Sequence, residues 1–396
     1  MGRPSQLLSD RYQLQLCESW QNWFDGVSHQ MPLPGFFRLP VDLDGLCASK
    51  PTQIWSGFML PDTLPLLSNG YGDWICIRIL ADGRFGELLH WYHGGGDWIP
   101  VGQHLAEAIL HDAVDVHRPI RKQMLRGAVE TARPKNTSER PQALHQWLAD
   151  SIGTVREDLS QDSVLQIVNA AQAGQYAVAL KLLVNARLAF EAAVCDYTEQ
   201  LIQQAVPSEH GSLNMLEDED CNRIAELCGS VIERRQDLGW AYSLLGWCQQ
   251  HAGQKDLSKA TFFSGRFASA FSDQSVRLRL HRFEQRYGKF SIAQLASARK
   301  DLPQSISDDE YLSLYLNNRD ANLVSRIQDY WLNLAQRAFA SSDYPEAYRC
   351  AYNAGWDIGA TSMPSYRKIL DLLFQSSQAA GWAARAAVAK AHLDAI

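Results

Sequence analysis

The sequence predicts an α+β domain over residues 1–118, a basic linker over residues 119–142 and an all-α repeat region over residues 143–396. Three observations lead to this division. Runs of β-branched and apolar residues between glycine turns are confined almost entirely to the first part. Alanine, leucine and glutamine at helical spacing dominate the last part. Between them, proline and charged residues interrupt every pattern, with six basic against two acidic side chains.

The composition favours a globular cytoplasmic protein. The 396 residues are 46% hydrophobic with a net charge of −7, which argues against nucleic acid as the main partner. No apolar run reaches the roughly 18 residues of a membrane span, and the start of the chain lacks a signal-peptide pattern. The eight cysteines form no Cys-x-x-Cys pair, so we expect reduced thiols. We interpret Cys221, Cys228 and Cys248 as small buried hydrophobes rather than zinc ligands.

The elements of the first domain follow from local patterns. Apolar residues at helical intervals predict one helix over residues 6–24. Prolines interrupt residues 31–51 so often that we expect a loop wrapping the core. The β-branched run at 74–80, followed by Asp82-Gly83, predicts a hairpin with residues 84–93.

A third strand and a helix complete the predicted antiparallel sheet with flanking helices. Gly94-Gly95-Gly96-Asp97 turns the chain into residues 98–101, where a proline suits a sheet edge or a strand end. Residues 104–114 carry apolar side chains on a helical period and close the domain.

One sequence motif, which we call the recurring phrase, repeats in the helical part: a small residue, an aromatic residue two positions later and an alanine three positions after that. It occurs as Gly174/Tyr176/Ala179, Gly288/Phe290/Ala293 and Ser342/Tyr344/Ala347, with a looser copy from Gly253 to Ala260. The pattern predicts helix hairpins, in which the small residue allows a tight turn and the alanine allows close helix packing. It is similar to tetratricopeptide (TPR) helix pairs, and the irregular spacing indicates a TPR-like α-solenoid.

The most distinctive stretch of the first domain runs from residue 60 to residue 77, where a Gly-x-Gly-Asp turn leads directly into an apolar strand. With the hairpin at Asp82-Gly83, the aromatic strand end at 90–93, the Asp97-Trp98-Ile99-Pro100 turn and the closing helix, it resembles the SUKH superfamily. That superfamily includes fungal cell-wall-synthesis regulators and bacterial immunity proteins. The resemblance covers about residues 60–113 and implies an α+β fold that binds proteins without catalysing a reaction. The proline-rich segment upstream departs from the usual pattern.

The glycine turns allow two interpretations. Successive glycine amides at Gly70 and Gly72 could hold a phosphate, but no Gly-Lys-Ser/Thr follows and the segment leads into a strand. We therefore interpret Gly70, Gly72 and Asp73 as a structural turn, and Gly95 and Asp97 likewise.

The segment from Glu87 to Asp97 is the strongest candidate for catalysis or metal binding. Glu87, His90 and His93 are ligand types for zinc or iron. Because side chains alternate faces along a strand, the three cannot easily converge, and we expect solvent-facing histidines at a flexible hairpin tip. No catalytic motif or nucleotide fingerprint occurs, so we predict no catalytic residue, no metal and no cofactor.

These observations favour a non-enzymatic protein-interaction molecule. Its predicted binding residues are Tyr71, Trp91, Tyr92 and Trp98, with interface and core both open for the tryptophans. In this hypothesis the SUKH-like domain binds one protein, such as a toxin or a regulatory protein, and the concave face of the array binds a second. One alternative is a hydrolase or nucleotide-utilising enzyme with its site around Glu87–Asp97. Another is a scaffold whose function lies only in the helical half.

Overall fold

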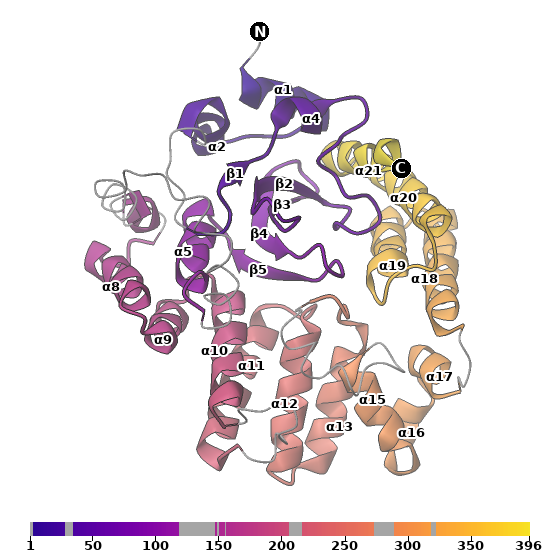
Figure 1. Cartoon of the computed structure of the whole chain (residues 1–396). Helices are drawn as coiled ribbons and strands as arrows, with labels where there is room; N and C mark the ends of the chain where they lie inside the picture. The colour runs from indigo at the N-terminus through magenta and orange to yellow at the C-terminus, as the bar shows by residue number, and fades with distance from the viewer. Residues whose placement is uncertain are drawn as a thin grey trace.

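The computed structural model describes residues 3–27, 35–118, 147–205 except 149 and 155, 216–272, 289–317 and 322–396. It confirms the predicted fold class, an N-terminal antiparallel sheet with helices followed by a largely helical region of paired helices (Figure 1). The basic linker over 119–142 lies outside the described residues. No helix in the described ranges combines the length and the apolar character needed to cross a bilayer.

The N-terminal sheet is a five-stranded antiparallel meander in chain order. Its strands are β1 (Leu39–Pro40), β2 (Thr63–Ser68), β3 (Trp74–Ile79), β4 (Phe85–Trp91) and β5 (Trp98–Gly102). The helices of this part are α1 (Pro4–Tyr12), α2 (Glu18–Asn22), the π-helical turn η1 (Trp23–Val27), α4 (Leu43–Cys47) and α5 (Leu105–Asp115). Every residue of β2 and β5 is buried, so both faces of the sheet are covered along these strands.

The helical region consists mainly of antiparallel helix pairs. Its longer helices are α8 (Gln161–Gln172), α9 (Tyr176–Ala186), α10 (Phe190–Ala205), α11 (Asp218–Arg234), α12 (Gly239–His251), α13 (Lys255–Ser264), α15 (Phe290–Ser297), α18 (Leu323–Ala340), α19 (Tyr344–Trp356), α20 (Met363–Ala379) and α21 (Ala383–Ala395). Shorter pieces are η3 (Gly265–Phe267), η4 (Arg299–Asp301), α16 (Gln304–Ser307) and α17 (Glu310–Leu316).

Two expectations for the first domain are wrong in detail. The single helix expected over residues 6–24 is broken after Tyr12, because Gln13 adopts a left-handed φ of 54° and the N–H of Gln15 donates to the Gly83 carbonyl at 3.0 Å. This contact with the β3–β4 turn replaces a helical hydrogen bond. The proline-rich segment contains β1 and α4 rather than loop alone, although residues 28–34 lie outside the description.

Strand β2 was not predicted from the sequence pattern. Its Pro65 lies at a register shift in the pairing with β3, where the missing N–H of proline interrupts the ladder. Strand β1 was not predicted either, whereas β3, β4 and β5 agree with the predicted strands to within two residues at either end.

The recurring phrase marks helix hairpins in the structure. Gly174, Gly253 and Ser342 adopt positive φ angles of 80°, 74° and 62° between paired helices. Gly288 falls outside the described residues, although the helix that follows it begins at Phe290 as the phrase predicts. The turn between α20 and α21 uses Gly381 in the same way, at a φ of 75°.

Gly381→Ala is expected to lower the free energy of unfolding by about 1 kcal/mol, because an L-residue at positive φ is strained. No atom lies within 4 Å of the position of an added Cβ, so only this backbone strain contributes. Gly229→Ala inside α11 is the matched control. It also has open space but no positive φ, and should raise stability by up to about 1 kcal/mol. Urea unfolding of both variants checks these opposite signs, and equal shifts would contradict the prediction.

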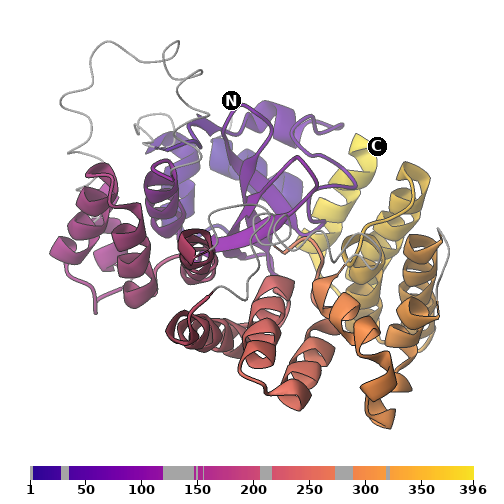
Figure 2. The ribbon, with the colours of Figure 1, turned by 60° about the horizontal axis from the view of Figure 1, so that its bottom comes forward.

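The helices from α8 to α21 form an arc around the sheet (Figures 1 and 2). Helix α5 packs against α8 and α9, α10 packs against β5, and α21 packs against α1. Two hydrogen bonds join the parts directly: the backbone N–H of Trp98 donates to the Phe271 carbonyl at 2.6 Å, and the side-chain Nε of Arg385 donates to the Ile79 carbonyl at 3.1 Å. The concave side of the array, predicted to bind a second partner, therefore faces the sheet of the same chain.

Candidate interaction surface

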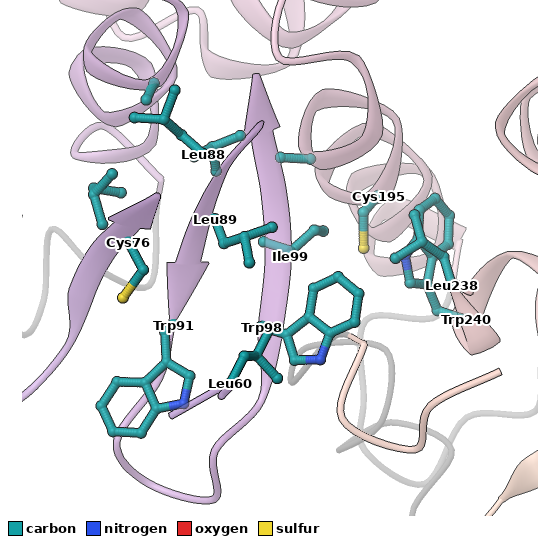
Figure 3. Packing of buried hydrophobic residues seen from close by; sticks show 14 of the residues in the cluster. Leu60, Cys76, Leu88, Leu89, Trp91, Trp98, Ile99, Cys195, Leu238 and Trp240 are labelled. Carbon is teal, nitrogen blue, oxygen red and sulfur yellow. The ribbon is translucent and has the colours of Figure 1, made fainter. Parts of the chain in front are cut away.

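Trp91 and Trp98 lie in the interior, 1% and 2% exposed. Figure 3 shows the Trp98 ring beside Leu60, with Cys195, Leu238 and Trp240 of the helical region next to β5. The indole of Trp91 donates to the Phe58 carbonyl at 3.3 Å. Of the two alternatives left open for these tryptophans, burial in the core is the one observed. Neither offers an exposed surface to a partner.

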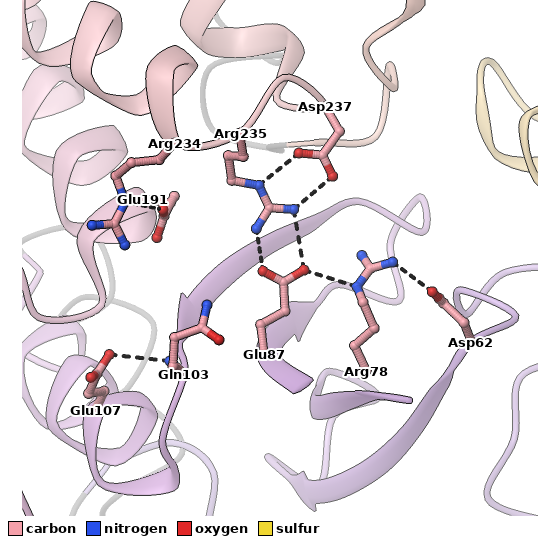
Figure 4. A network of polar contacts seen from close by, with 9 residues as sticks. All are labelled: Asp62, Arg78, Glu87, Gln103, Glu107, Glu191, Arg234, Arg235 and Asp237. Atoms are coloured by element: carbon pink, nitrogen blue, oxygen red, sulfur yellow. Dashed lines mark hydrogen bonds and ion pairs between the residues drawn. The ribbon is translucent and has the colours of Figure 1, made fainter. Parts of the chain in front are cut away.

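A chain of five charged side chains connects the sheet to the helical region (Figure 4). Arg78 on β3 binds Asp62 at 2.7 Å and Glu87 on β4 at 2.9 Å. Glu87 in turn binds Arg235, which follows α11, and Arg235 binds Asp237 at 2.7 Å. Each guanidinium lies between two carboxylates, and each of the three carboxylates has at least one cationic partner.

The two arginines of this network also stack over the Trp98 ring, at 5.6 Å for Arg78 and 5.7 Å for Arg235. Burial alone would lower the pKa of Arg78, but the carboxylates of Asp62 and Glu87 outweigh it and hold that pKa well above the usual value. Arg78 therefore keeps its positive charge over the whole ordinary pH range.

A second buried joint fixes α5 to the helical region. Asp196 on α10 contacts His111 Nε2 at 3.1 Å and pairs with Arg118. Arg118 Nε donates to the Tyr176 hydroxyl of α9 at 3.2 Å. The side of the sheet domain that meets the array is thus held by buried polar contacts.

The turn that follows Ile54 displays two aromatic side chains. The carbonyl of Trp55 accepts hydrogen bonds from the N–H groups of Phe58 and Met59 at 3.1 and 2.9 Å. Gly57, between them, has a φ of 81°, and a Cβ there would lie 3.0 Å from the Tyr366 ring, so only glycine fits. Ile54 and Met59 are buried and anchor the turn, while Trp55 and Phe58 are 42% and 48% exposed.

A neighbouring turn displays Tyr71, which is 65% exposed. The side-chain oxygen of Asn69 accepts from the N–H groups of Tyr71 and Asp73 at 2.8 and 3.1 Å, which fixes the backbone. Gly70 and Gly72 have φ angles of 76° and 107°. Both glycines are therefore required by the turn itself, and the segment leads into β3.

The Asp73 carboxylate joins this turn to the hairpin tip. Its Oδ1 accepts from the His93 N–H at 3.0 Å and contacts His93 Nδ1 at 2.8 Å. The His93 ring lies 6.3 Å from that of Trp55, so the two turns and the hairpin tip meet. At this tip Gly96, with a φ of 79°, rather than Gly95, adopts the conformation that requires glycine, and Asp97 is buried.

We call Trp55, Phe58, Tyr71, Leu39 and Met363 the aromatic surface. Met363 lies beside the first turn and Leu39 beside the second: the Cβ position at Gly57 lies 3.4 Å from Met363 Sδ, and that at Gly70 lies 3.4 Å from Leu39 Cδ1. Among the described residues, five of the nine large hydrophobic side chains that are exposed belong to this surface. Such gathering distinguishes an interaction site from the scattered single hydrophobic side chains of an ordinary surface.

The residues of the enzyme alternative have separate surroundings. Glu87 binds two arginines through both of its carboxylate oxygens. His90 is buried with its ring 4.8 Å from Phe37 and stacked at 3.8 Å on the half-buried Tyr92. The expectation of a solvent-facing His90 is therefore wrong, whereas His93 is exposed and pairs with an aspartate. The structure does not bring these three side chains together.

The cysteines singled out in the sequence are buried and free. Burial raises the pKa of Cys221, Cys228 and Cys248, so their thiols are protonated at neutral pH. Within the part of the chain that the structure describes, no three His, Cys, Asp or Glu side chains gather as a metal site would require.

The fold and the aromatic surface together define an α+β sheet domain held inside an arc of helix hairpins, with aromatic side chains displayed on its turns. No family model, no curated protein and no solved structure gives a significant match to the chain. The resemblances to the SUKH superfamily and to TPR pairs stay predictions from the residues.

The sequence singled out Tyr71, which the structure shows to be exposed, but not the other four residues of the aromatic surface. The available signal was the glycine at 57 between Trp55 and Phe58, followed by a buried pair, which is typical of a turn that displays its aromatic residues. Leu39 and Met363 carry no such signal, because only the tertiary structure brings Leu39 to the turn at Gly70 and the start of α20 to the turn at Gly57.

Proposed function

We propose that this chain is a non-enzymatic protein-binding molecule whose partner docks on the aromatic surface. The observation that carries the proposal is the gathering of Trp55, Phe58 and Tyr71 on two turns with backbones fixed by hydrogen bonds. Aromatic side chains lose little conformational entropy on binding, and a fixed backbone loses less still. Exposed aromatic residues of this kind are enriched among those that dominate protein interfaces.

The polar groups around the aromatic surface suit a protein interface. Asn69, Asp73 and His93 lie beside the exposed rings and hold one another through hydrogen bonds. Interfaces characteristically combine an apolar centre with a polar rim that excludes water. The partner then covers the rings and meets hydrogen-bonding groups at the edge.

The chemistry of the partner follows from charge. Residues 1–118 contain seven basic and thirteen acidic side chains, which favours a basic protein through electrostatic steering. A toxin or a regulatory protein, as the SUKH resemblance implies, is the proposed partner class. A second partner on the concave face of the array would have to displace the sheet, so the proposal has one docking surface.

The partner is identified by photo-crosslinking in cells of the source organism. A benzophenone amino acid at position 71 should capture one protein, and the same amino acid at Val178, which is exposed on α9, should not capture it. Binding of the purified pair is then measured by calorimetry. Equal capture of that protein from positions 71 and 178 would refute the proposal.

The double variant Trp55→Ala/Phe58→Ala is expected to weaken binding of that partner by about 10- to 100-fold, the effect of removing interface anchors. Val178→Ala/Leu257→Ala removes two equally exposed side chains elsewhere and should change affinity by less than about threefold. Unchanged thermal unfolding of both variants separates lost contacts from lost folding. Similar affinity losses in the two variants would contradict the assignment of the site.

A further inference from the structure

We propose that His392 of α21 is an acid-sensitive anchor: it fixes the turn bearing Trp55 and Phe58 to the helical region at neutral pH and releases it in acid. The consequence for partner binding rests on the proposed function above. The anchor itself rests on contacts between the turn and three helices near the end of the chain.

The turn is held from outside the sheet domain. Ser56 Oγ donates to the backbone carbonyl of His392 at 2.6 Å. Trp356 Nε1, at the end of α19, donates to the Phe58 carbonyl at 3.4 Å. Gly57 packs against the ring of Tyr366 on α20. The backbone between the two exposed aromatic residues is therefore fixed by α19, α20 and α21 together.

The His392 side chain has no place for a second proton. It is 0% exposed, and neither ring nitrogen has a hydrogen-bond partner among the described residues. The Tyr348 hydroxyl and Asp62 Oδ1, also buried, lack partners as well. Asp62 attracts a proton to His392, but its other oxygen is already bound to Arg78 at 2.7 Å.

Other charged groups around α21 are engaged elsewhere. Arg385 on α21 donates to the Ile79 carbonyl at 3.1 Å, and Arg11 on α1 lies 3.8 Å from Asp394. The remaining titratable groups nearby are Tyr352 on α19 and those that line a groove between α20 and α21: Arg367, Lys368, Asp371 and Lys390, with Asp394. Asp62 is thus the acidic group that acts on the buried ring.

Burial lowers the pKa of His392 to about 4, against an ordinary 6.5, and Asp62 opposes this lowering. The pKa is depressed in the closed state, so the anchor is at full strength above about pH 6.5 and weakens as the pH falls toward 4. Protonation requires the ring to reach water. For this, α21 must leave the sheet, and the contact between Ser56 and the His392 carbonyl is lost with it.

Hydrogen exchange of the full chain tests the anchor without a partner. We expect residues 53–60 and 383–395 to open about 30-fold more often at pH 5 than at pH 7.5, after correction for intrinsic exchange. Helix α12 serves as the internal control and should keep its protection. His392→Leu, which has no proton to gain, should show a change of less than about threefold in all three segments.

Equal acid opening in the wild type and in His392→Leu would overturn the proposal, and so would full protection of the wild type at pH 5. If His392→Leu does not fold, the imidazole NMR signals of the wild type decide. His392 should titrate well below pH 6.5, over the pH range in which residues 53–60 open. Titration near pH 6.5 with the turn still protected would refute the anchor.

The experiments can refute the acid-sensitive anchor and the proposed function independently. If acid opens the turn but Trp55→Ala/Phe58→Ala leaves partner affinity intact, the anchor stands and the proposed function falls. If the double variant loses binding but the turn stays closed in acid, the aromatic surface stands without the anchor. With both correct, wild-type affinity falls at pH 5 and that of His392→Leu does not.

Discussion

Asp357→Ala is expected to lower the free energy of unfolding by about 3–5 kcal/mol, the usual cost of removing one partner of a buried ion pair. Asp357 is buried after α19, pairs with the buried Lys289, and accepts from Trp331 Nε1 at 2.9 Å and from the Tyr311 hydroxyl. Among the described residues, its removal leaves the ammonium of Lys289 with the Arg266 carbonyl and the Tyr311 hydroxyl, at 2.7 and 3.0 Å.

The pH dependence of Asp357→Ala gives a second readout. Burial lowers the pKa of Lys289 in the native protein, and Asp357 opposes that lowering. Without the aspartate, the pKa of Lys289 in the folded protein falls further below its value in the unfolded chain. A depressed lysine pKa destabilises the fold below the ordinary value of about 10.4, so the variant should regain stability between pH 7 and pH 10. Urea unfolding across that range measures it.

A double variant separates charge from hydrogen bonding. Lys289→Met/Asp357→Asn removes both charges and keeps an acceptor for Trp331 and Tyr311, so we expect a smaller loss than for Asp357→Ala, about 1–2 kcal/mol. The exposed pair of Lys259 and Asp256 is the surface control, and Asp256→Ala should cost less than about 1 kcal/mol. A loss below 1 kcal/mol for Asp357→Ala would show that the pair is not held in a buried site.

Arg235→Ala is expected to cost about 2–4 kcal/mol, because Arg235 is the residue through which the helical region joins the buried network of the sheet. Its guanidinium is 15% exposed, binds Glu87 and Asp237, and stacks on Trp98. The substitution leaves Glu87 with one cationic partner in a buried interface and uncovers one face of the Trp98 ring. The joint between the two regions should loosen before the sheet itself unfolds.

The preceding residue is the matched control for this prediction. Arg234 also pairs with one carboxylate, Glu191, and lies 5.0 Å from the Phe190 ring, but it is 40% exposed and stays within the helical region. Arg234→Ala should cost less than Arg235→Ala, about 1–2 kcal/mol, because it leaves the buried Glu191 carboxylate without this partner but disturbs no contact with the sheet. Thermal unfolding compares the two variants, and hydrogen exchange of β4 and β5 reports on the joint. Equal losses of exchange protection would mean that Arg235 has no special place in the interface.

Most of the local structure could be predicted because it depends on neighbours in sequence. The hairpin at Asp82-Gly83, the strand at 98–102 and the helix hairpin at Ser342 each follow from a turn residue next to a periodic run. The errors occur where a distant residue intervenes. The helix ends before Gln13 because the N–H of Gln15 donates to the β3–β4 turn, and no local sequence pattern predicts this contact.

The candidate site was predictable only in part, for the same reason. Tyr71 could be singled out because a glycine turn displays it whatever surrounds the sheet. Trp91 and Trp98 could not be assigned to core or interface, because their burial depends on Phe58, Arg235 and Phe271, which lie far away in the sequence.

The fold class and the helix-hairpin pattern follow from the sequence alone, because hydrophobic period and turn chemistry act over a few residues. The enclosure of the sheet by the array (Figure 1) and the position of Met363 beside the turn at Gly57 depend instead on the tertiary structure. Those outcomes depend on single pairings between distant residues, such as Arg235 with Glu87 and Ser56 with His392. The sequence does not reveal which partner a charged or polar side chain will contact, because burial and geometry in the folded chain select that partner.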